Sequence, residues 1–582
     1  MESEKYSKAI ILLLFFWLSS ASAFEPEAVP ANPDLVALTE SWVPPTLYNV
    51  TDGVYVAVGY GRSNPVLIEG TDGLIIVDPG ESTTSAEMVK AAYNEYLDDI
   101  FSKKPVKAII YTHYHDCHME GTSVFAENDS EIVAHESFET NLFGTAALCS
   151  QIFPIKVYRA VKYAGIPYQK DPGYFVNGGI FPFSVPGPSG YLPPTLTVGD
   201  ELETNIAGVN LTLVHAPGET SDIIYVWLPD KKVIVQIGNF YKSFPAINTL
   251  RGASHRDPLN YIDSIDSMRK LNAEYLVLIH SGGGPIVGAD NVSRTLTNAR
   301  DALQYVHDQT VRYMNQGLTP GEIIEEIELP PHLANDPNLK EYFGEVDRDI
   351  FQIFQQYMGW FTGKSRDIFP TSPTEEAEKM AYLAGGIDEL EVKAKTALDE
   401  GNMKWALIFS DYVLLLDPKN GEAREVKNSA LLSLAEESSN AQVRNYLLSE
   451  YLEETGQINI PLEKGFSLLD ENIVFYMPME TIFRCMAVSL NATKALDEEY
   501  VVDLELSDDP ISGEYALCVR RGIVEVQEEL AGYPKFTILT DSLTWKNLVL
   551  GKLDPEEAVA SGGVEIGGAD PEEFYNFMDL FR

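Results

Sequence analysis

Short apolar runs and longer amphipathic segments alternate along the first half of the chain. Runs bounded by Gly, Pro, Asn or Asp predict strands, at residues 54–58, 65–77, 106–111, 131–134, 211–215, 223–228, 232–236 and 275–279. Helical periodicity predicts helices at 82–97 and 258–271. Residues 135–195, rich in Gly, Pro and aromatics, are predicted to be irregular. This alternation predicts an α/β sandwich with functional residues on loops at strand ends.

The periodicity changes twice in the second half. From residue 291 to 454 it is helical, which predicts an all-α unit. Later apolar runs predict an α+β unit with antiparallel strands at 501–506, 514–520, 523–527 and 536–540. A chain of 582 residues is long enough for three or four domains. We place them at 24–290, 291–454 and 455–582.

The first 23 residues are predicted to be a cleaved signal peptide. Two lysines precede an apolar run at 9–18, which is too short to span a bilayer, and Ala21 and Ala23 supply the small residues of a cleavage site. A retained membrane anchor is the alternative. We expect a secreted protein with no stable membrane anchor. Sequons for N-glycosylation agree with a glycoprotein and lie at Asn49, Asn128, Asn210, Asn291 and Asn491.

Charge and cysteine content exclude several classes of function. The formal net charge of −45 argues against nucleic-acid binding and against attraction to anionic membranes. An anionic substrate would be repelled at long range and therefore needs a locally positive site. The four cysteines do not form a disulfide scaffold, although Cys117 could pair with Cys149, and Cys485 with Cys518.

Three of the nine histidines lie within six residues, directly after the strand predicted at 106–111. Because side chains alternate along a strand, His113 and His115 point to the same side of the strand end. A turn after them can present His118 as a third ligand. Imidazole clusters of this kind bind borderline divalent metals, above all zinc. The alternative is a cluster of surface histidines without a ligand.

Residues 112–118 (Thr-His-Tyr-His-Asp-Cys-His) resemble the T-H-x-H-x-D-H motif of the metallo-β-lactamase superfamily, with Cys117 at the aspartate position. Further segments resemble the secreted alkyl sulfatases of that superfamily, namely Ala216-Pro217-Gly218-Glu219, Asn239 with Leu250-Arg251-Gly252, and His280 before a glycine loop. The helical unit resembles their dimerisation domain. The last unit resembles their sterol-carrier-like domain, which could hold an alkyl chain or be merely structural.

This resemblance implies a metallo-β-lactamase αββα sandwich, a homodimer, and hydrolysis of a small amphipathic alkyl sulfate ester to alcohol and sulfate. One or two zinc ions per chain would activate the water. The implied catalytic residues, which also bind the first metal, are His113, His115 and Glu219. The second metal would be bound by His118, His280 and Cys117. Arg251, with Asn239 and Tyr241, would bind the substrate's sulfate, and Asp78 would hold the metal-site loop without binding metal.

Two positions depart from the family pattern at the second metal site. Cys117 and Gly238 stand where the family carries acidic residues, although a thiolate is a good zinc ligand. Three outcomes stay open: a two-metal site that uses Cys117, a one-metal enzyme, or a catalytically weak dimer that binds amphipathic or sulfated lipids. A different metallo-hydrolase, such as a lactonase or esterase, is a further alternative. Glu219 argues against it, because such enzymes usually carry His there.

Overall fold

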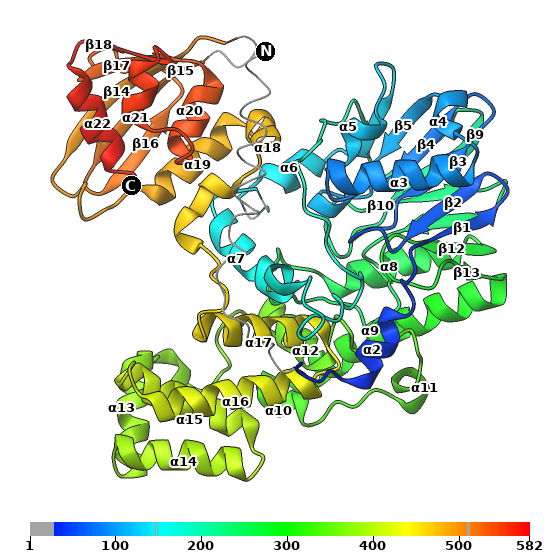
Figure 1. The fold of residues 1–582 in the computed structure, drawn as a ribbon, viewed down its shortest axis with the longest axis horizontal. Helices are drawn as coiled ribbons and strands as arrows, with labels where there is room; N and C mark the ends of the chain where they lie inside the picture. Colours follow the sequence, from blue (N-terminus) through cyan, green and yellow to red (C-terminus); the bar gives the residue numbers. More distant parts are fainter. Residues whose placement is uncertain (1–27, 146, 148, 509–512) are drawn as a thin grey trace.

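A computed structural model describes residues 28–145, 147, 149–508 and 513–582, and the predicted signal peptide lies outside them. Two sheets pack face to face in the first half of the chain (Figure 1). The seven-stranded sheet runs in the order β1 (Thr46–Thr51), β2 (Val54–Val58), β3 (Val66–Glu69), β4 (Leu74–Val77), β5 (Val106–Ile110), β6 (Glu131–His135) and β7 (Leu196–Val198). The six-stranded sheet runs β13 (Ile286–Val287), β12 (Tyr275–Leu278), β11 (Val233–Gln236), β10 (Ile224–Leu228), β9 (Val209–His215) and β8 (Glu201–Ile206).

Alternating side chains give each sheet two covered faces. In β4, Ile75 and Val77 belong to the core between the sheets, whereas Leu74 and Ile76 pack in the core beneath helix α3 (Thr83–Tyr96). Helices α8 (Pro258–Arg269) and α9 (Ala289–Met314) cover the outer face of the second sheet (Figure 1). Strands covered on both faces are apolar throughout, as β4 is. The predicted αββα sandwich is confirmed.

One edge of the sandwich carries the loops that hold the candidate residues. Strands β4 and β5 are parallel, so Asp78 and the histidine segment leave their sheet at the same edge. In the other sheet β11 and β12 are parallel, and β9 is antiparallel to β10, which is antiparallel to β11. The carboxyl ends of β9, β11 and β12 therefore also meet at one edge, which brings Glu219 and His280 together.

The region between β6 and β7 is more regular than predicted. It contains α6 (Phe138–Phe143), α7 (Phe153–Tyr163) and a 3₁₀ turn at Ile166–Tyr168. Helix α7 begins with Pro154 in its first turn, a position that tolerates proline because its N–H would be unpaired there. The surrounding Gly and Pro residues hide its short helical period in the sequence. Further short helices of this half are α2 (Pro33–Thr39), α4 (Ile100–Lys103) and α5 (Thr122–Phe125).

The helical unit follows α9 and forms the lower part of Figure 1. Its helices are α10 (Pro320–Ile324), α11 (Pro331–Ala334), α12 (Val346–Met358), α13 (Pro373–Ala384), α14 (Ile387–Asp399), α15 (Met403–Leu416), α16 (Gly421–Glu437) and α17 (Ala441–Glu454). Helix α10 opens with a capping box in which Thr319 and Glu322 satisfy each other's backbone N–H groups. Helix α17 packs against α7 and so joins this unit to the sandwich.

The C-terminal unit is the predicted α+β structure. Its sheet has the order β16 (Ile523–Gln527), β15 (Gly513–Arg520), β14 (Glu499–Leu506), β17 (Phe536–Thr540) and β18 (Val564–Gly567). Its helices are α18 (Glu471–Tyr476), α19 (Met479–Ser489), α20 (Ser542–Val549), α21 (Pro555–Ala560) and α22 (Pro571–Asp579). The unit contacts the sandwich where Thr481 Oγ1 donates to Phe143 O at 2.7 Å. No helix in the described ranges is long and apolar enough to cross a membrane.

Arg444 of α17 ties the helical unit to the first half of the chain. Its buried guanidinium donates to four backbone carbonyls from three separate segments, those of Val29, Pro30, Tyr174 and Ala435. Removal of the guanidinium leaves these carbonyls without their donor, and unpaired buried acceptors are costly.

We expect Arg444→Met to lower the free energy of the first unfolding transition by roughly 3 kcal/mol, measured by urea denaturation. Arg424→Met is the matched control, because Arg424 forms a half-exposed ion pair with Glu454. Such a pair contributes about 1 kcal/mol at most. Equal effects of the two substitutions would contradict the role of Arg444.

Candidate metal centre

Two groups of three potential ligands lie side by side at the loop edge of the sandwich. In the first group, the ligand atoms of His113, His115 and Glu219 all lie within 4.8 Å of one another, and all three residues are buried. In the second group, Cys117, His118 and His280 satisfy the same condition. The structure thus brings together all six residues that the sequence predicts as metal ligands.

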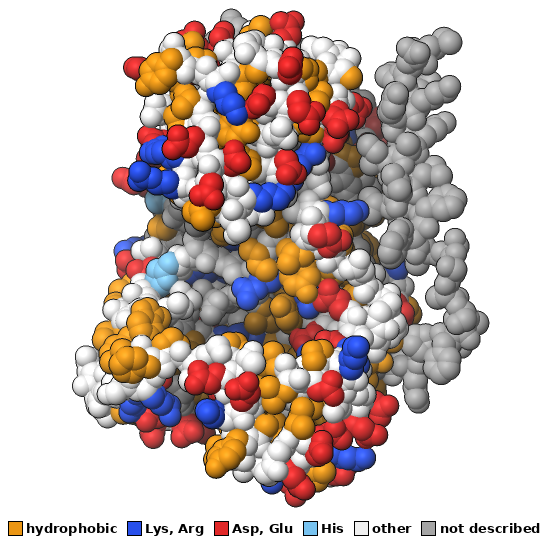
Figure 2. Space-filling view, turned by 90° about the vertical axis from the view of Figure 1, so that its left-hand side faces the viewer, with side chains coloured by type: hydrophobic (Ala, Val, Ile, Leu, Met, Phe, Trp, Pro, Cys, Tyr) orange, Lys and Arg blue, Asp and Glu red, His pale blue; other side chains and the backbone are white. Residues whose placement is uncertain are grey.

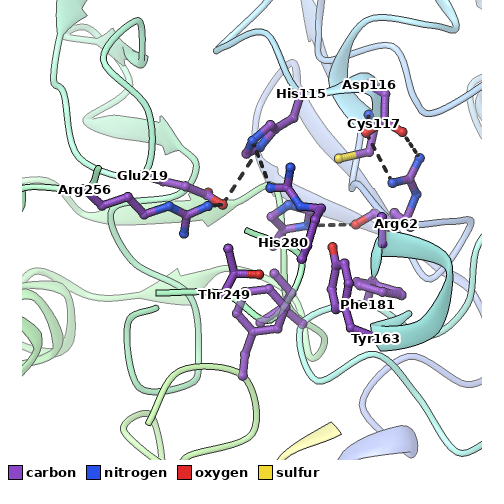
Figure 3. A pocket seen from close by; sticks show the side chains of 14 residues that line it. Arg62, His115, Asp116, Cys117, Tyr163, Phe181, Glu219, Thr249, Arg256 and His280 are labelled. Carbon is purple, nitrogen blue, oxygen red and sulfur yellow. Dashed lines mark hydrogen bonds and ion pairs between the residues drawn. The ribbon is translucent and has the colours of Figure 1, made fainter. Parts of the chain in front are cut away.

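The first group is held in a ligand-like arrangement by its neighbours. His113 Nε2 lies 2.8 Å from His115 Nδ1, and His115 Nδ1 lies 3.8 Å from Glu219 Oε1. Arg256 donates to Glu219 Oε1 at 3.1 Å (Figure 3). Burial raises the pKa of Glu219, but the charge of Arg256 with other nearby cationic groups outweighs burial and lowers this pKa to about 2. Glu219 is therefore a carboxylate at neutral pH.

The second group depends on hydrogen bonds to the far nitrogen of each imidazole. His118 Nδ1 lies 2.7 Å from Asp78 Oδ2, and His280 Nδ1 lies 2.7 Å from the carbonyl oxygen of Arg62. Such bonds orient a ring and leave Nε2 for a ligand. Asp78 also accepts from Thr112 N and Thr112 Oγ1, so it holds the histidine loop as expected and is not itself in either group.

The protonation states of the buried groups suit a divalent cation. Desolvation lowers the pKa of His113, His115 and His118 well below its usual value, so the rings are neutral, which is the form that binds metals. Burial raises the pKa of the Cys117 thiol, against the charge of Arg62. A coordinating ion deprotonates such a thiol outright.

Two ligand atoms have no hydrogen-bond partner although they are fully buried. They are His118 Nε2 in the second group and Glu219 Oε2 beside the first. A buried polar atom without a partner costs free energy unless something else binds it. The neutral imidazoles, the carboxylate and the thiol form a donor set that zinc prefers. The residues present therefore fit a metal ion.

Gly238 cannot be replaced by the acidic residue of the family pattern without displacing Glu219. Its φ of +72° favours glycine, and a β-carbon there would lie 2.7 Å from Glu219 Oε2. The side chain of Glu219 thus occupies the space that a side chain at position 238 would need. The backbone conformation of this loop and the position of Glu219 therefore both disfavour a carboxylate side chain at position 238.

Asn239 and Tyr241, which we expected to contact substrate, do not line the cavity beside the metal groups. Both are buried: Asn239 Nδ2 donates to Ala216 O at 2.7 Å, and Tyr241 OH accepts from Ala246 N at 2.9 Å. The amide nitrogen of Asn239 and the hydroxyl of Tyr241 are thus engaged by the backbone, whereas Asn239 Oδ1 is buried without a hydrogen-bond partner. His215 likewise contributes no ligand, because its Nε2 bonds Ser221 O and its ring stacks on His135.

The cavity beside the two groups has a volume of about 70 Å³, room for roughly five water molecules. Figure 3 shows its polar side, to which His115, Glu219, His280 and Arg256 contribute. Apolar residues close the other side: Ala160, Tyr163, Ile180, Phe181 and Phe343.

Three arginines line this cavity, and they differ in their partners. Arg62 pairs with Glu81 and Asp116, and Arg256 pairs with Glu219. Arg251 has no ion-pair partner in the described part of the chain, and its Nη2 lies 3.4 Å from His115 Nε2. The sequence analysis identified Arg251 but neither Arg256 nor Arg62, and no motif marks Arg62.

All four cysteines are free, so neither possible disulfide is formed. The Cys117 thiol is thus present as a potential ligand. This favours the interpretation in which Cys117 belongs to the second metal group.

We expect Gly238→Ala to weaken metal binding by the first group about 10–100-fold, because the new methyl group displaces Glu219. Metal content and affinity would be measured by titration of the metal-stripped protein. Gly317→Ala is the matched control, since Gly317 has a φ of +85° but no atom within 4 Å of its added β-carbon. The control carries the backbone strain alone and should bind metal normally; equal losses in both variants would refute the steric explanation.

The sequence matches three family descriptions: metallo-beta-lactamase superfamily over residues 58–280, alkyl sulfatase dimerisation over 319–456, and alkyl sulfatase C-terminal over 468–582. It is 31% identical to a linear primary-alkylsulfatase from Pseudomonas sp., over 86% of this chain and 96% of that relative. It is 27% identical to an alkyl/aryl-sulfatase of Saccharomyces cerevisiae, over 82% of this chain and 74% of the relative. The solved structure of a stereoselective inverting sec-alkylsulfatase from Pseudomonas sp. shares the fold, with a TM-score of 0.83 at 22% identity over 94% of this chain and 86% of the other. The chain belongs to the alkyl sulfatase family of the metallo-β-lactamase superfamily.

Proposed function

We propose that the protein hydrolyses alkyl sulfate esters to an alcohol and sulfate, with zinc bound by His113, His115 and Glu219. The observation that carries this proposal is the cavity in which Arg251, without an ion-pair partner in the described part of the chain, lies beside His115, Glu219 and His280 of the two metal groups. The names of the curated relatives, which are alkylsulfatases, support the substrate class.

The residues of the cavity have different roles in substrate binding and in the reaction. Arg251 holds the sulfate group, because a guanidinium is planar, permanently charged and able to donate two parallel hydrogen bonds. A zinc ion held by His113, His115 and Glu219 would supply a Lewis acid that lowers the pKa of water towards about 7. Glu219 stays ionised through Arg256 and balances the charge of the cation.

The size of the cavity bears on how an alkyl sulfate binds. A volume of about 70 Å³ accommodates a tetrahedral head group but not a long alkyl chain. The chain of the substrate then lies along the apolar side of the cavity, near Phe181 and Phe343, and extends outwards. Its burial there adds roughly 0.8 kcal/mol of binding for each CH₂ group.

A competing function is binding of sulfated or amphipathic lipids with little turnover. The observation in its favour is the loss of two acidic residues at Cys117 and Gly238, which leaves fewer negative charges for a second cation. Binding of alkyl sulfates by metal-replete protein without release of sulfate would favour it over hydrolysis.

We expect Arg251→Met to lower kcat/KM for hexyl and dodecyl sulfate by roughly 100–1,000-fold, because the variant loses a charged donor to the sulfate. Removal of metal by a chelator should abolish sulfate release, and added zinc should restore it. Arg269→Met is the control, since Arg269 pairs with Asp266 on α8, outside the cavity. Metal-replete protein that releases no sulfate, or an Arg251→Met variant as active as Arg269→Met, would contradict the proposal.

We also propose that two chains associate through the helical unit. Large apolar side chains are exposed there, among them Trp360 (70%) and Phe369 (79%), and Figure 2 shows hydrophobic side chains gathered on the lower part of the molecule. Large apolar side chains exposed on a surface indicate a candidate protein interface. The match of this region to the alkyl sulfatase dimerisation family supports the proposal.

The double substitution Trp360→Glu with Phe369→Glu should convert the dimer to a monomer, because it places charges in an apolar interface. Size-exclusion chromatography with light scattering measures the mass. The control is Tyr533→Glu, which alters an equally exposed aromatic residue (83%) in the C-terminal unit and should leave the dimer intact. A wild-type monomer, or a double variant that remains dimeric, would refute this assignment.

A further inference from the structure

A short segment between β2 and β3, residues Arg62, Ser63 and Asn64, contacts both loops that carry the second metal group. Arg62 lies at the cavity, and Ser63 and Asn64 are buried. The segment comes from neither of the motifs that mark the ligands. We call these three residues the clip.

The side chain of Arg62 holds the turn Asp116–His118 from one side. Its Nη1 and Nη2 donate to the two carboxylate oxygens of Asp116, at 3.2 and 2.7 Å (Figure 3). Its Nε and backbone N donate to the buried carboxylate of Glu81, which fixes the guanidinium in turn. Bidentate pairs of this kind define the orientation of both partners.

Ser63 holds the same turn through the backbone. Its hydroxyl donates to the carbonyl oxygen of Cys117 at 2.6 Å. Together, Arg62 and Ser63 hydrogen-bond two consecutive residues, Asp116 through its side chain and Cys117 through its main chain. The turn that carries Asp116 and Cys117 therefore has a fixed orientation relative to the metal groups.

The clip also holds the loop that carries His280. The carbonyl oxygen of Arg62 accepts from His280 Nδ1 at 2.7 Å, which leaves Nε2 of that ring unprotonated and available to a metal. Asn64 Nδ2 donates to Leu278 O and Ser281 O, at 3.1 and 2.8 Å. The end of β12 is thereby tied to the turn that carries Cys117.

The consequence concerns which of two adjacent residues faces the metal. Asp116 and Cys117 are both potential ligands, but the carboxylate of Asp116 is occupied by Arg62, and only Cys117 lies with His118 and His280 within 4.8 Å. We propose that the clip formed by Arg62, Ser63 and Asn64 positions the second metal group and selects the thiolate of Cys117, not Asp116, as its third protein ligand. Position 117 carries a carboxylate in the family and a thiol in this chain, and the clip holds that thiol beside His118 and His280.

This inference rests on the proposed function only in requiring that the protein binds metal, and it is tested without an activity assay. Metal-stripped, full-length protein is titrated with Co²⁺, whose bond to a thiolate produces a charge-transfer absorption in the near ultraviolet. We expect two equivalents to bind and one of them to produce this absorption. Cys117→Ser should abolish the absorption, whereas Asp116→Asn, which keeps the thiol, should retain it once Co²⁺ is saturating.

The clip itself is tested by Arg62→Lys, which keeps the charge but loses the bidentate fork, and by Ser63→Ala. Each substitution should weaken binding of the Co²⁺ equivalent that produces the thiolate absorption about 10–100-fold and leave binding of the other equivalent unchanged. The control is Ser410→Ala, which removes a similarly buried hydroxyl-to-carbonyl bond in α15. Because Ser63→Ala removes only a hydroxyl, it remains informative if Arg62→Lys fails to fold.

Absorption that persists in Cys117→Ser, or that is absent from Asp116→Asn at saturating Co²⁺, would overturn the assignment of the ligand. Clip variants that bind the second equivalent as tightly as Ser410→Ala would overturn the positioning role. The failure of the proposed function has a different outcome. Protein that binds two equivalents with the thiolate absorption but cleaves no alkyl sulfate would refute hydrolysis and leave the clip intact.

Discussion

The carboxylate of Asp78 is the interaction on which the arrangement of the site depends. It is fully buried at the end of β4 and accepts from Thr112 N, Thr112 Oγ1 and His118 Nδ1, at 2.8, 2.6 and 2.7 Å. Each of these donors would cost about 1–3 kcal/mol if left unpaired. The loop after β5 must therefore close over Asp78, and this closure turns His118 towards His280. Asp222 acts similarly from the other sheet, where it accepts from Tyr114 N at 2.9 Å.

A second constraint is the contrast between an acidic chain and a cationic cavity. The chain carries a net charge of −45, yet three arginines line a cavity of about 70 Å³. Two of them are neutralised by carboxylates, so they orient ligands instead of binding an anion: Arg256 orients Glu219, and Arg62 orients Asp116. Arg251 is left with its charge available. Within a buried site of low dielectric constant, one such charge attracts an anion more strongly than distant surface carboxylates, screened by salt, repel it.

Much of the fold and the two groups of candidate metal ligands could be predicted from the sequence. The strands β4 and β5 are continuous apolar runs, and the spacing of His113 and His115 follows from the period of a strand. The resemblance to alkyl sulfatases rested on such short segments, and the family assignment is confirmed. The substrate contacts expected of Asn239 and Tyr241 stay predictions: neither residue lines the cavity, and motif matching says nothing about which backbone groups a side chain meets. Helix α7 was missed because the Gly- and Pro-rich segments on both sides of it hide its short helical period in the sequence.

The sequence by itself determined the layered architecture, the strand-end position of the histidines and the absence of acidic side chains at Cys117 and Gly238. These are local properties, set by residue type and by the periodicity of neighbouring positions. Only the tertiary structure decided what replaces the missing charges. Glu219 occupies the space beside Gly238, and Arg62, 54 positions before Asp116, turns that carboxylate away from the metal groups. Contacts between residues so far apart in sequence form only when the sheets pack, and no local pattern encodes them.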